Sequence, residues 1–269
     1  MRSTSLIRPF FFLALPGAIV LVALVYGGME FYHYLTKSKQ FTLRSVEVLT
    51  AGPVNKEELI KLAGIRANAN IFSIDLSDTK EKIEKNPWVY SASVTRALPD
   101  KIQIHYVAEE PVAILSSMDV LYYVNKEGKV FYKITKDNSL KYPLIYLNSA
   151  LSILELSPSK LMPALRVVSW AERSSMVNLS DLGDIEVRGG VYSEELPLLV
   201  TMAFPPSGLS KKYKQKRRFF TMSFSETEID IQAKRAEAVL QHLLQQGKNP
   251  KLIRLELGKK IVVKMDQKL

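Results

Sequence analysis

An α+β fold that follows a single membrane-spanning helix is predicted by three features of the sequence. A charge-free apolar run lies near the amino end, a strand–helix–helix–strand–strand pattern follows it, and a longer segment then mixes strands with helices. The 269 residues are 47% hydrophobic and 24% charged, which is typical of folded chains. The formal net charge is +10, and the absence of Cys excludes disulfide scaffolds, thiolate metal sites and cysteine nucleophiles.

Residues 9–29 are predicted to form the membrane-spanning helix. No charged residue lies between Arg8 and Glu30, and these 21 residues match the ~20 that cross the hydrocarbon of a bilayer. Tyr26 and Tyr34 lie where an aromatic belt is expected. A cleaved signal peptide is the alternative, but the run exceeds the usual ~7 to 15 apolar residues and no A-x-A-like site follows it. We therefore expect an uncleaved anchor.

The orientation of this anchor rests on the lengths of the flanking segments. Basic residues lie on both sides, with Arg2 and Arg8 before the helix and Lys37 and Lys39 after it, so their count does not decide. A long folded domain is translocated largely regardless of its charge. We expect residues 1–8 to form a short cytoplasmic tail, residues 30–42 a juxtamembrane linker, and the rest an extracytoplasmic body.

The first half of a small domain is predicted to begin at Leu43 and to end before Pro87. Val46 and Val48 alternate with polar residues as in a half-buried strand. Asn55 followed by Glu58 resembles a capping box that opens a helix ending at Gly64. A second short helix is expected to begin at Ser77 or Asp78.

The second half of this domain consists of two predicted strands. Pro87 stops the second helix, and strands follow over Val89 to Arg96 and Lys101 to Val107, joined by the turn-forming Pro99-Asp100. In the later strand Ile102, Ile104 and Tyr106 share the face expected to be buried. Trp88, between a Pro and a strand, is interpreted as a core residue rather than a binding residue.

These residues resemble the POTRA domain of the bacterial cell-division proteins FtsQ and DivIB. The resemblance depends on the order and spacing of several motifs after one anchor: Leu43-x-x-Val46-x-Val48, Gly64, Asn70-Ile71-Phe72-x-x-Asp75, Pro87-Trp88-Val89, Ala92, Val94, Arg96, Pro99, Ile102-x-Ile104 and Pro111-Val112-Ala113. It implies a POTRA domain over residues 43–110. The sequence departs from the family pattern at Ala108-Glu109-Glu110, where an acidic and then a basic residue are usual, and at Asn125, where an Asp is common.

Residues 111–266 are predicted to form a second, β-rich domain with a mixed or antiparallel sheet and packed helices, leaving 267–269 as the C-terminal end. The expected elements are a hairpin over Leu121 to Val124 and Lys129 to Ile134, a helix after Ser157 with Pro158 at its first position, strands at Ile185 to Val187 and Leu198 to Ala203, a helix over Asp230 to Gln246 ended by Gly247, and two closing strands within Leu252 to Met265 with a turn at Gly258. The final helix is expected to bury Ala233, Ala236, Val239, Leu240, Leu243 and Leu244.

The closing strands are the predicted partner-binding site. In FtsQ-like proteins the terminal strands resemble an open edge that receives a strand from FtsB, which pairs with FtsL. Unpaired backbone groups supply the hydrogen bonds of such a site, so its side chains can vary. The predicted residues are Leu252, Arg254, Leu255, Glu256, Leu257, Gly258, Lys259, Ile261, Val262, Val263, Lys264 and Met265. The alternative is an ordinary buried strand pair whose lysines discourage edge pairing.

The resemblance implies a non-catalytic, single-pass scaffold in the inner (cytoplasmic) membrane at the division site, which links early and late division proteins during septum formation. The expected partners resemble FtsB and FtsL, together with FtsK-like or FtsW/FtsI-like proteins. No catalytic residue, metal, cofactor, nucleic acid or small-molecule substrate is expected, because the three His are scattered and no phosphate-binding motif is present.

Three other interpretations were weighed. Ser157 and Lys160 fit the S-x-x-K form of penicillin-recognising serine enzymes, but no S-D-N or K-T-G element follows, so an envelope hydrolase or transferase is the alternative function. The basic run from Lys211 to Arg218 is either a solvated loop or a surface for anionic lipid or an acidic partner. A POTRA-bearing outer-membrane assembly protein would need a long series of barrel strands that this length cannot hold.

Overall fold

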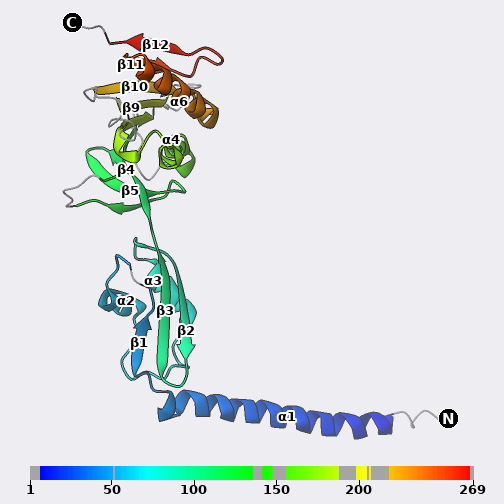
Figure 1. Cartoon of the computed structure of the whole chain (residues 1–269). Coiled ribbons are helices and arrows are strands. Elements are labelled where there is room, and N and C mark those ends of the chain that lie inside the picture. Colours follow the sequence, from blue (N-terminus) through cyan, green and yellow to red (C-terminus); the bar gives the residue numbers. More distant parts are fainter. Residues whose placement is uncertain are drawn as a thin grey trace, which may run out of the picture. The chain divides into compact units, whose positions relative to one another are not determined.

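The computed structural model describes residues 7–50, 52–135, 141–147, 156–187, 198–204, 206 and 218–266, with side chains from residue 17 onward. The chain divides into two compact units, Met1–Glu109 and Glu110–Leu269. Helices and sheets are both present, so the predicted α+β class is confirmed. Figure 1 labels the elements in chain order.

The first unit begins with helix α1, Ile7–Lys37. Within it, Gly17–Lys37 is long and apolar enough to cross a membrane, and no part of that stretch is buried against the protein. The helix is longer than predicted, because residues 30–37 of the expected linker continue it and a 3-10 turn, η1 (Lys39–Phe41), follows. Residues 30–37 contain neither Gly nor Pro, so nothing in the sequence ends the helix earlier.

The rest of the first unit has the predicted βααββ order. The elements are β1 (Ser45–Val48), α2 (Lys56–Ala63), α3 (Leu76–Glu84), β2 (Val89–Ala97) and β3 (Lys101–Ala108). The strands form a three-stranded sheet in the order β1-β3-β2. Strand β1 is parallel to β3, whereas β2 and β3 form an antiparallel hairpin.

The two helices of this unit begin with side-chain caps. Asn55 accepts a hydrogen bond from the Glu57 N–H at 3.2 Å, as expected for the first residue before α2. Glu58 does not complete the predicted capping box, since its Oε1 instead accepts from Asn86 Nδ2 at 3.0 Å. Helix α3 starts before Ser77, because Asp75 accepts from two N–H groups of its first turn at 2.9 and 3.1 Å.

The core of the first unit lies between its helices and the sheet. Ile102, Ile104 and Tyr106 are fully buried, which confirms the predicted alternation along β3. Trp88 is partly buried and packs against the same cluster, in agreement with its interpretation as a core residue. The Tyr106 hydroxyl donates to the Val54 carbonyl oxygen at 3.5 Å.

The second unit is a nine-stranded mixed sheet with helices. Its elements are β4 (Pro111–Ser117), β5 (Val120–Asn125), β6 (Val130–Lys133), β7 (Leu144–Leu147), η3 (Pro158–Lys160), α4 (Met162–Arg173), η4 (Leu179–Asp181), β8 (Leu182–Val187), β9 (Leu198–Phe204), β10 (Arg218–Phe224), α6 (Ile229–Gln245), β11 (Pro250–Arg254) and β12 (Val262–Met265). The strand order is β12-β11-β10-β9-β8-β7-β4-β5-β6. Three neighbouring pairs are parallel, β4 with β7, β7 with β8, and β10 with β11.

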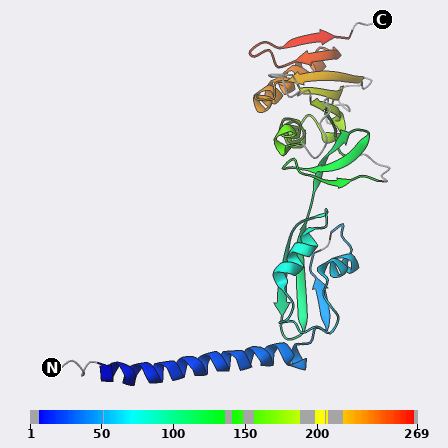
Figure 2. The same ribbon diagram turned by 180° about the vertical axis from the view of Figure 1, so that it is seen from behind.

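Helices α4 and α6 close the core of the second unit against the sheet. Figure 2 shows both helices on the same side of the strands, with α6 beside β10, β11 and β12. The two helices are linked through Glu237, which accepts hydrogen bonds from Trp170 Nε1 at 3.0 Å and from Ser174 Oγ at 2.6 Å. Of the residues predicted on the inner face of α6, all are buried except Val239, which packs against the core while partly exposed.

Helix α4 begins later than the sequence predicts. Pro158 opens the short 3-10 turn η3, and the α-helix starts only at Met162. Ser157 precedes Pro158, and a residue in that position disfavours helical backbone geometry. The second Pro, at position 163, suits the first turn of a helix, so the regular helix starts at Met162. Of the basic run, residues 211–217 lie outside the described residues. Arg218 opens β10 and forms an ion pair with Asp266 at 2.6 Å.

The cap of α3 provides a test of the first unit. We expect Asp75→Ala to lower the free energy of unfolding by about 1 kcal/mol, because two N–H groups lose their acceptor. Urea unfolding of the detergent-solubilised chain, followed by Trp88 fluorescence in a Trp170→Phe background, measures it. Asp78→Ala is the matched control, since it removes an exposed ion pair with Lys82 and should cost less. Equal losses for the two variants would contradict the assigned cap.

Candidate functional site

Strand β12 forms one edge of the nine-stranded sheet. It pairs with β11 in antiparallel register, with Leu252 opposite Lys264 and Arg254 opposite Val262. Among the described residues, no strand pairs with the other side of β12. An edge strand presents alternate N–H and C=O groups outward, which can pair with another chain.

Two glycines and a crossover helix place this strand. Gly247 has a φ of 64° and ends α6, after which β11 enters the sheet parallel to β10, with Met222 opposite Ile253. Gly258 has a φ of 65° and turns the chain into β12, as the sequence predicts for that position. Parallel neighbours need a crossover, and α6 supplies it.

An apolar groove of about 460 Å³ lies between α6 and β12. Its lining residues come from α6 with its C-cap, Arg235, Ala238, Val239, His242, Leu243 and Gln246, and from β12 with the residue before it, Ile261, Val263 and Met265. Apolar side chains supply most of its walls, while Arg235 and the His242–Gln246 hydrogen bond of 2.7 Å provide polar atoms. The groove therefore lies next to the unpaired edge of β12, and it can receive apolar side chains of a bound strand.

The predicted site residues fall into three settings. Leu255 is only 1% exposed, so it supports β11 rather than offering a contact surface, whereas Leu252 is partly exposed. The exposed turn and strand residues are Leu257, Gly258, Lys259, Val262, Lys264 and Met265, with Arg254 exposed on β11. Ile261 and Val263 are half-buried in the groove wall. Leu257 lies beyond the end of β11 and is 42% exposed, so it is not buried with Leu255.

Glu256 joins β10 to β11 through two hydrogen bonds. Its carboxylate accepts from the Ser223 hydroxyl and, at 2.7 Å, from Arg254 Nε. Burial raises the pKa of the Glu256 carboxyl, but the hydrogen bonds from Ser223 and Arg254 outweigh it, and the pKa lies below its ordinary value of 4.5. The charged carboxylate therefore stabilises the sheet next to the edge strand.

Sequence reasoning missed the α6 contribution to this site. Arg235 donates from Nη1 to the Gly258 carbonyl oxygen at 2.6 Å and so holds the turn before β12. Ala238, His242 and Gln246 complete the helix wall of the groove. The available signal was the half-buried Val239 on the border of the apolar stripe, because a border residue often contacts a neighbouring element.

The alternative catalytic residues gain no support from their positions. Ser157 and Lys160 are exposed at η3, and the Ser157 hydroxyl lies 2.8 Å from that of Ser159. The Lys160 backbone N–H donates to the Ser157 carbonyl oxygen at 3.0 Å, but within the described residues no hydrogen bond joins the Ser157 hydroxyl to the Lys160 amine. A serine nucleophile requires a base within hydrogen-bond reach. Over the same residues, no group of three or more His, Asp or Glu could hold a metal ion.

Comparison with known proteins identifies relatives of the chain. The FtsQ-type POTRA domain family matches residues 41–107. Cell division protein FtsQ of Geotalea daltonii is 33% identical over 129 residues, 48% of this chain and 46% of that protein. FtsQ of Syntrophotalea carbinolica is 30% identical over 178 residues, 65% and 61% of the two chains. Cell division protein DivIB of Clostridium tetani is 34% identical over 107 residues, 38% and 37%.

These similarities support the FtsQ/DivIB family and confirm the resemblance predicted from the sequence. The matched POTRA residues, 41–107, coincide with the βααββ elements of the first unit. The aligned segments span 61% or less of the length of the three relatives.

The Glu256 network predicts a dependence of stability on pH. Because the folded pKa is depressed, this group contributes stability above its unfolded pKa and loses it as pH falls through the folded pKa, below 4.5. We expect Glu256→Gln to destabilise the second unit at neutral pH and to equal the wild type at acid pH. Urea unfolding followed by Trp170 fluorescence measures this. Ser223→Ala is the companion variant, and a gap between wild type and Glu256→Gln that is independent of pH would contradict the assignment.

Proposed function

We propose, on the support that these matches give to the FtsQ/DivIB family, that the chain is a non-catalytic, single-pass scaffold of the bacterial division machinery. The curated relatives are named cell division proteins. Helix α1 supplies a membrane anchor, the POTRA domain a docking module near the membrane, and the second unit a strand that captures a partner. Residues 1–8 stay in the cytoplasm and both units lie outside it, at the division site of the inner membrane.

The observation that carries this proposal is the unpaired edge at β12. Val262 and Met265 are 48% and 37% exposed along a strand that has one neighbour among the described strands of the sheet. A partner strand added there gains the backbone hydrogen bonds of a new ladder, each with a net contribution of about 0.5 to 1.5 kcal/mol. Every second side chain of the partner strand then faces the groove beside α6.

The charges around this edge favour an acidic partner segment. Lys259 and Lys260 follow Gly258, and Lys264 lies on β12 itself, all of them exposed. A row of lysines discourages self-pairing between two copies of the same edge, because like charges would face each other. It attracts a strand of opposite charge. Proteins resembling FtsB and FtsL are the proposed occupants, and FtsK-like or FtsW/FtsI-like proteins are proposed for other surfaces.

Cross-linking from the edge tests strand capture. The chain has no Cys, so a single introduced Cys is the only thiol. We expect Val262→Cys, loaded with a short thiol-reactive photo-cross-linker, to capture a small membrane division protein in dividing cells. Lys133→Cys, on β6 at the opposite edge of the sheet, is the matched control and should not capture it. Equal capture of the division protein from the two edges would contradict strand addition at β12.

A charge substitution tests the link to division. We expect Val262→Glu to weaken partner binding about tenfold or more, because a carboxylate at the edge repels an acidic strand. Val262→Thr keeps a β-branched side chain without charge and should bind as the wild type does. Both variants should fold, since Val262 is exposed.

The readout is septation in cells depleted of the unmodified protein, with a fluorescent fusion that reports position. The Val262→Thr fusion should localise to the division plane and restore septa, whereas the Val262→Glu fusion should not restore them. A wild-type fusion spread evenly over the membrane, or normal septation without the protein, would end the proposal of a division role. Restored septa with Val262→Glu would reject only the role of the edge.

A further inference from the structure

The carboxyl end of α1 is fastened to the POTRA domain by one amide side chain. Asn70 Nδ2 donates to the Leu35 carbonyl oxygen at 2.8 Å and to that of Ser38 at 3.4 Å. The Asn70 Oδ1 accepts the Phe72 N–H at 2.8 Å, so both ends of the amide are fixed. Carbonyl groups in the last turn of a helix have no partner within it, and Asn70 supplies one.

Backbone contacts hold the loop between α2 and α3 against the same place. The Leu43 N–H donates to the Ala69 carbonyl oxygen, and the Ile71 N–H donates to that of Phe41, each at 2.8 Å. The Phe41 ring packs edge-on against Phe72, with centroids 5.0 Å apart. Residues 69–72 are therefore held beside the end of α1 and the turn that follows it.

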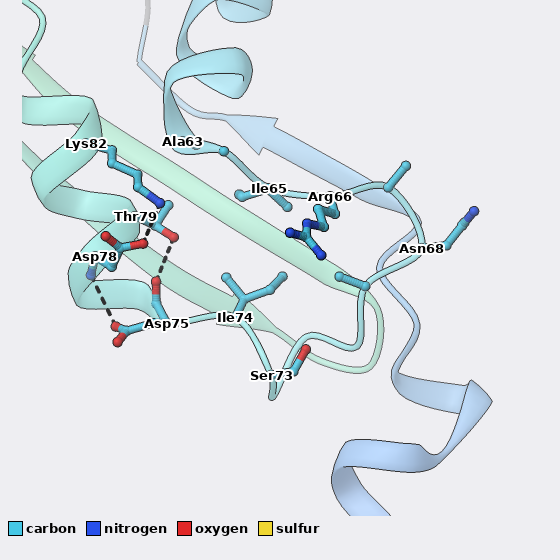
Figure 3. Close-up of a pocket in the computed structure, with 13 residues that line it drawn as sticks. Ala63, Ile65, Arg66, Asn68, Ser73, Ile74, Asp75, Asp78, Thr79 and Lys82 are labelled. Carbon is cyan, nitrogen blue, oxygen red and sulfur yellow. Dashed lines mark hydrogen bonds and ion pairs between the residues drawn. The ribbon is translucent and has the colours of Figure 1, made fainter.

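Three exposed cations surround this junction, and we call them the juxtamembrane collar: Lys37, Lys39 and Arg66. In the described part of the chain none of the three has an ion pair, whereas the neighbouring Arg44 pairs with Asp100 at 3.2 Å. Figure 3 shows Arg66 on the loop that lines a cavity of about 520 Å³, across from Lys82. Lys82 is already engaged by Asp78 at 2.6 Å, so it is not counted in the collar.

The length of α1 sets the height of the collar above the bilayer. The charge-free run ends at Met29, and Leu35 follows six residues later, about 9 Å farther along a helix normal to the membrane. The headgroup layer is about 5 to 8 Å thick on each side of the hydrocarbon. Tilt brings the collar closer. Lys37 and Lys39 therefore lie at the headgroups or within a Debye length, about 8 Å, of them, and Arg66 lies on the loop that Asn70 fastens to this end of α1.

We propose that the juxtamembrane collar binds the headgroups of anionic phospholipids and so seats the POTRA domain on the membrane surface. This rests on the membrane anchor proposed above. Each Lys or Arg near an anionic surface gains attraction there, and Asn70 fastens the loop that carries Arg66 to the end of α1. Exposed Phe31, Tyr32 and Tyr34 along the last turns of α1 add the aromatic residues favoured at such an interface.

Fluorescence quenching in nanodiscs tests the collar with the full chain. Ala67→Cys places a single environment-sensitive dye on the exposed loop next to Arg66, and lipids with a nitroxide on the headgroup quench it by contact. We expect quenching to rise when phosphatidylglycerol is added to a zwitterionic bilayer, and to fall with salt. The triple variant Lys37→Gln, Lys39→Gln and Arg66→Gln should lose this rise, with about fivefold less local lipid enrichment for each cation removed at low salt.

Two controls make the outcomes separable. In the first control the dye is placed at Lys248→Cys in the second unit, where it should show no response that depends on the collar. In the second control the dye stays at position 67 and three exposed cations of the second unit are removed by Lys126→Gln, Lys133→Gln and Lys251→Gln, which should leave the lipid response unchanged. If the chain inserts into nanodiscs but quenching does not rise with phosphatidylglycerol, the collar proposal is wrong and the anchor proposal stands. Failure of the chain to insert overturns the anchor and the collar together. If soluble polyglutamate in detergent produces a response equal to that of the lipid, the collar binds an acidic protein. That outcome overturns the lipid proposal.

Discussion

The structure of this chain depends on how backbone N–H and C=O groups are paired at the end of a helix and at the edge of a sheet. Inside a sheet or helix each N–H and C=O group has a partner, but a terminal strand and the last turn of a helix leave groups without one. The carboxyl end of α1 obtains its partner from Asn70 within the same unit. Strand β12 obtains none on its outer side within the described residues. One limit is closed by the protein itself, and the other is open to a second chain.

The open edge depends on packing that lies behind it. The crossover helix α6 buries Ala236 and Leu240 against the sheet, which fixes the position where β11 enters beside β10. Glu256 then ties β11 to Ser223 of β10. These contacts give β12 a rigid neighbour, and a rigid edge loses less conformational entropy when another strand is added to it.

Local patterns predicted much of the fold, whereas contacts between distant residues did not follow from them. The alternation of Ile102, Ile104 and Tyr106 identified the buried face of β3, because side chains alternate along any strand. Asp75 was missed as a cap since Ser77 and Asp78 offer the same chemistry nearby in the sequence. The groove beside β12 was missed because it depends on how α6 and a strand about twenty residues away pack together, which no local period encodes.

The junction at Asn70 has a mechanical consequence. Leu35 and Asn70 are 35 positions apart along the chain, so a pull on the POTRA domain reaches α1 directly through this hydrogen bond as well as through residues 38–42. The load is shared in parallel by the Asn70 amide, by the Leu43–Ala69 and Phe41–Ile71 backbone contacts, and by the packed rings of Phe41 and Phe72. Bonds loaded side by side must fail together, and traction on this domain is therefore passed into α1 instead of being absorbed by a slack tether.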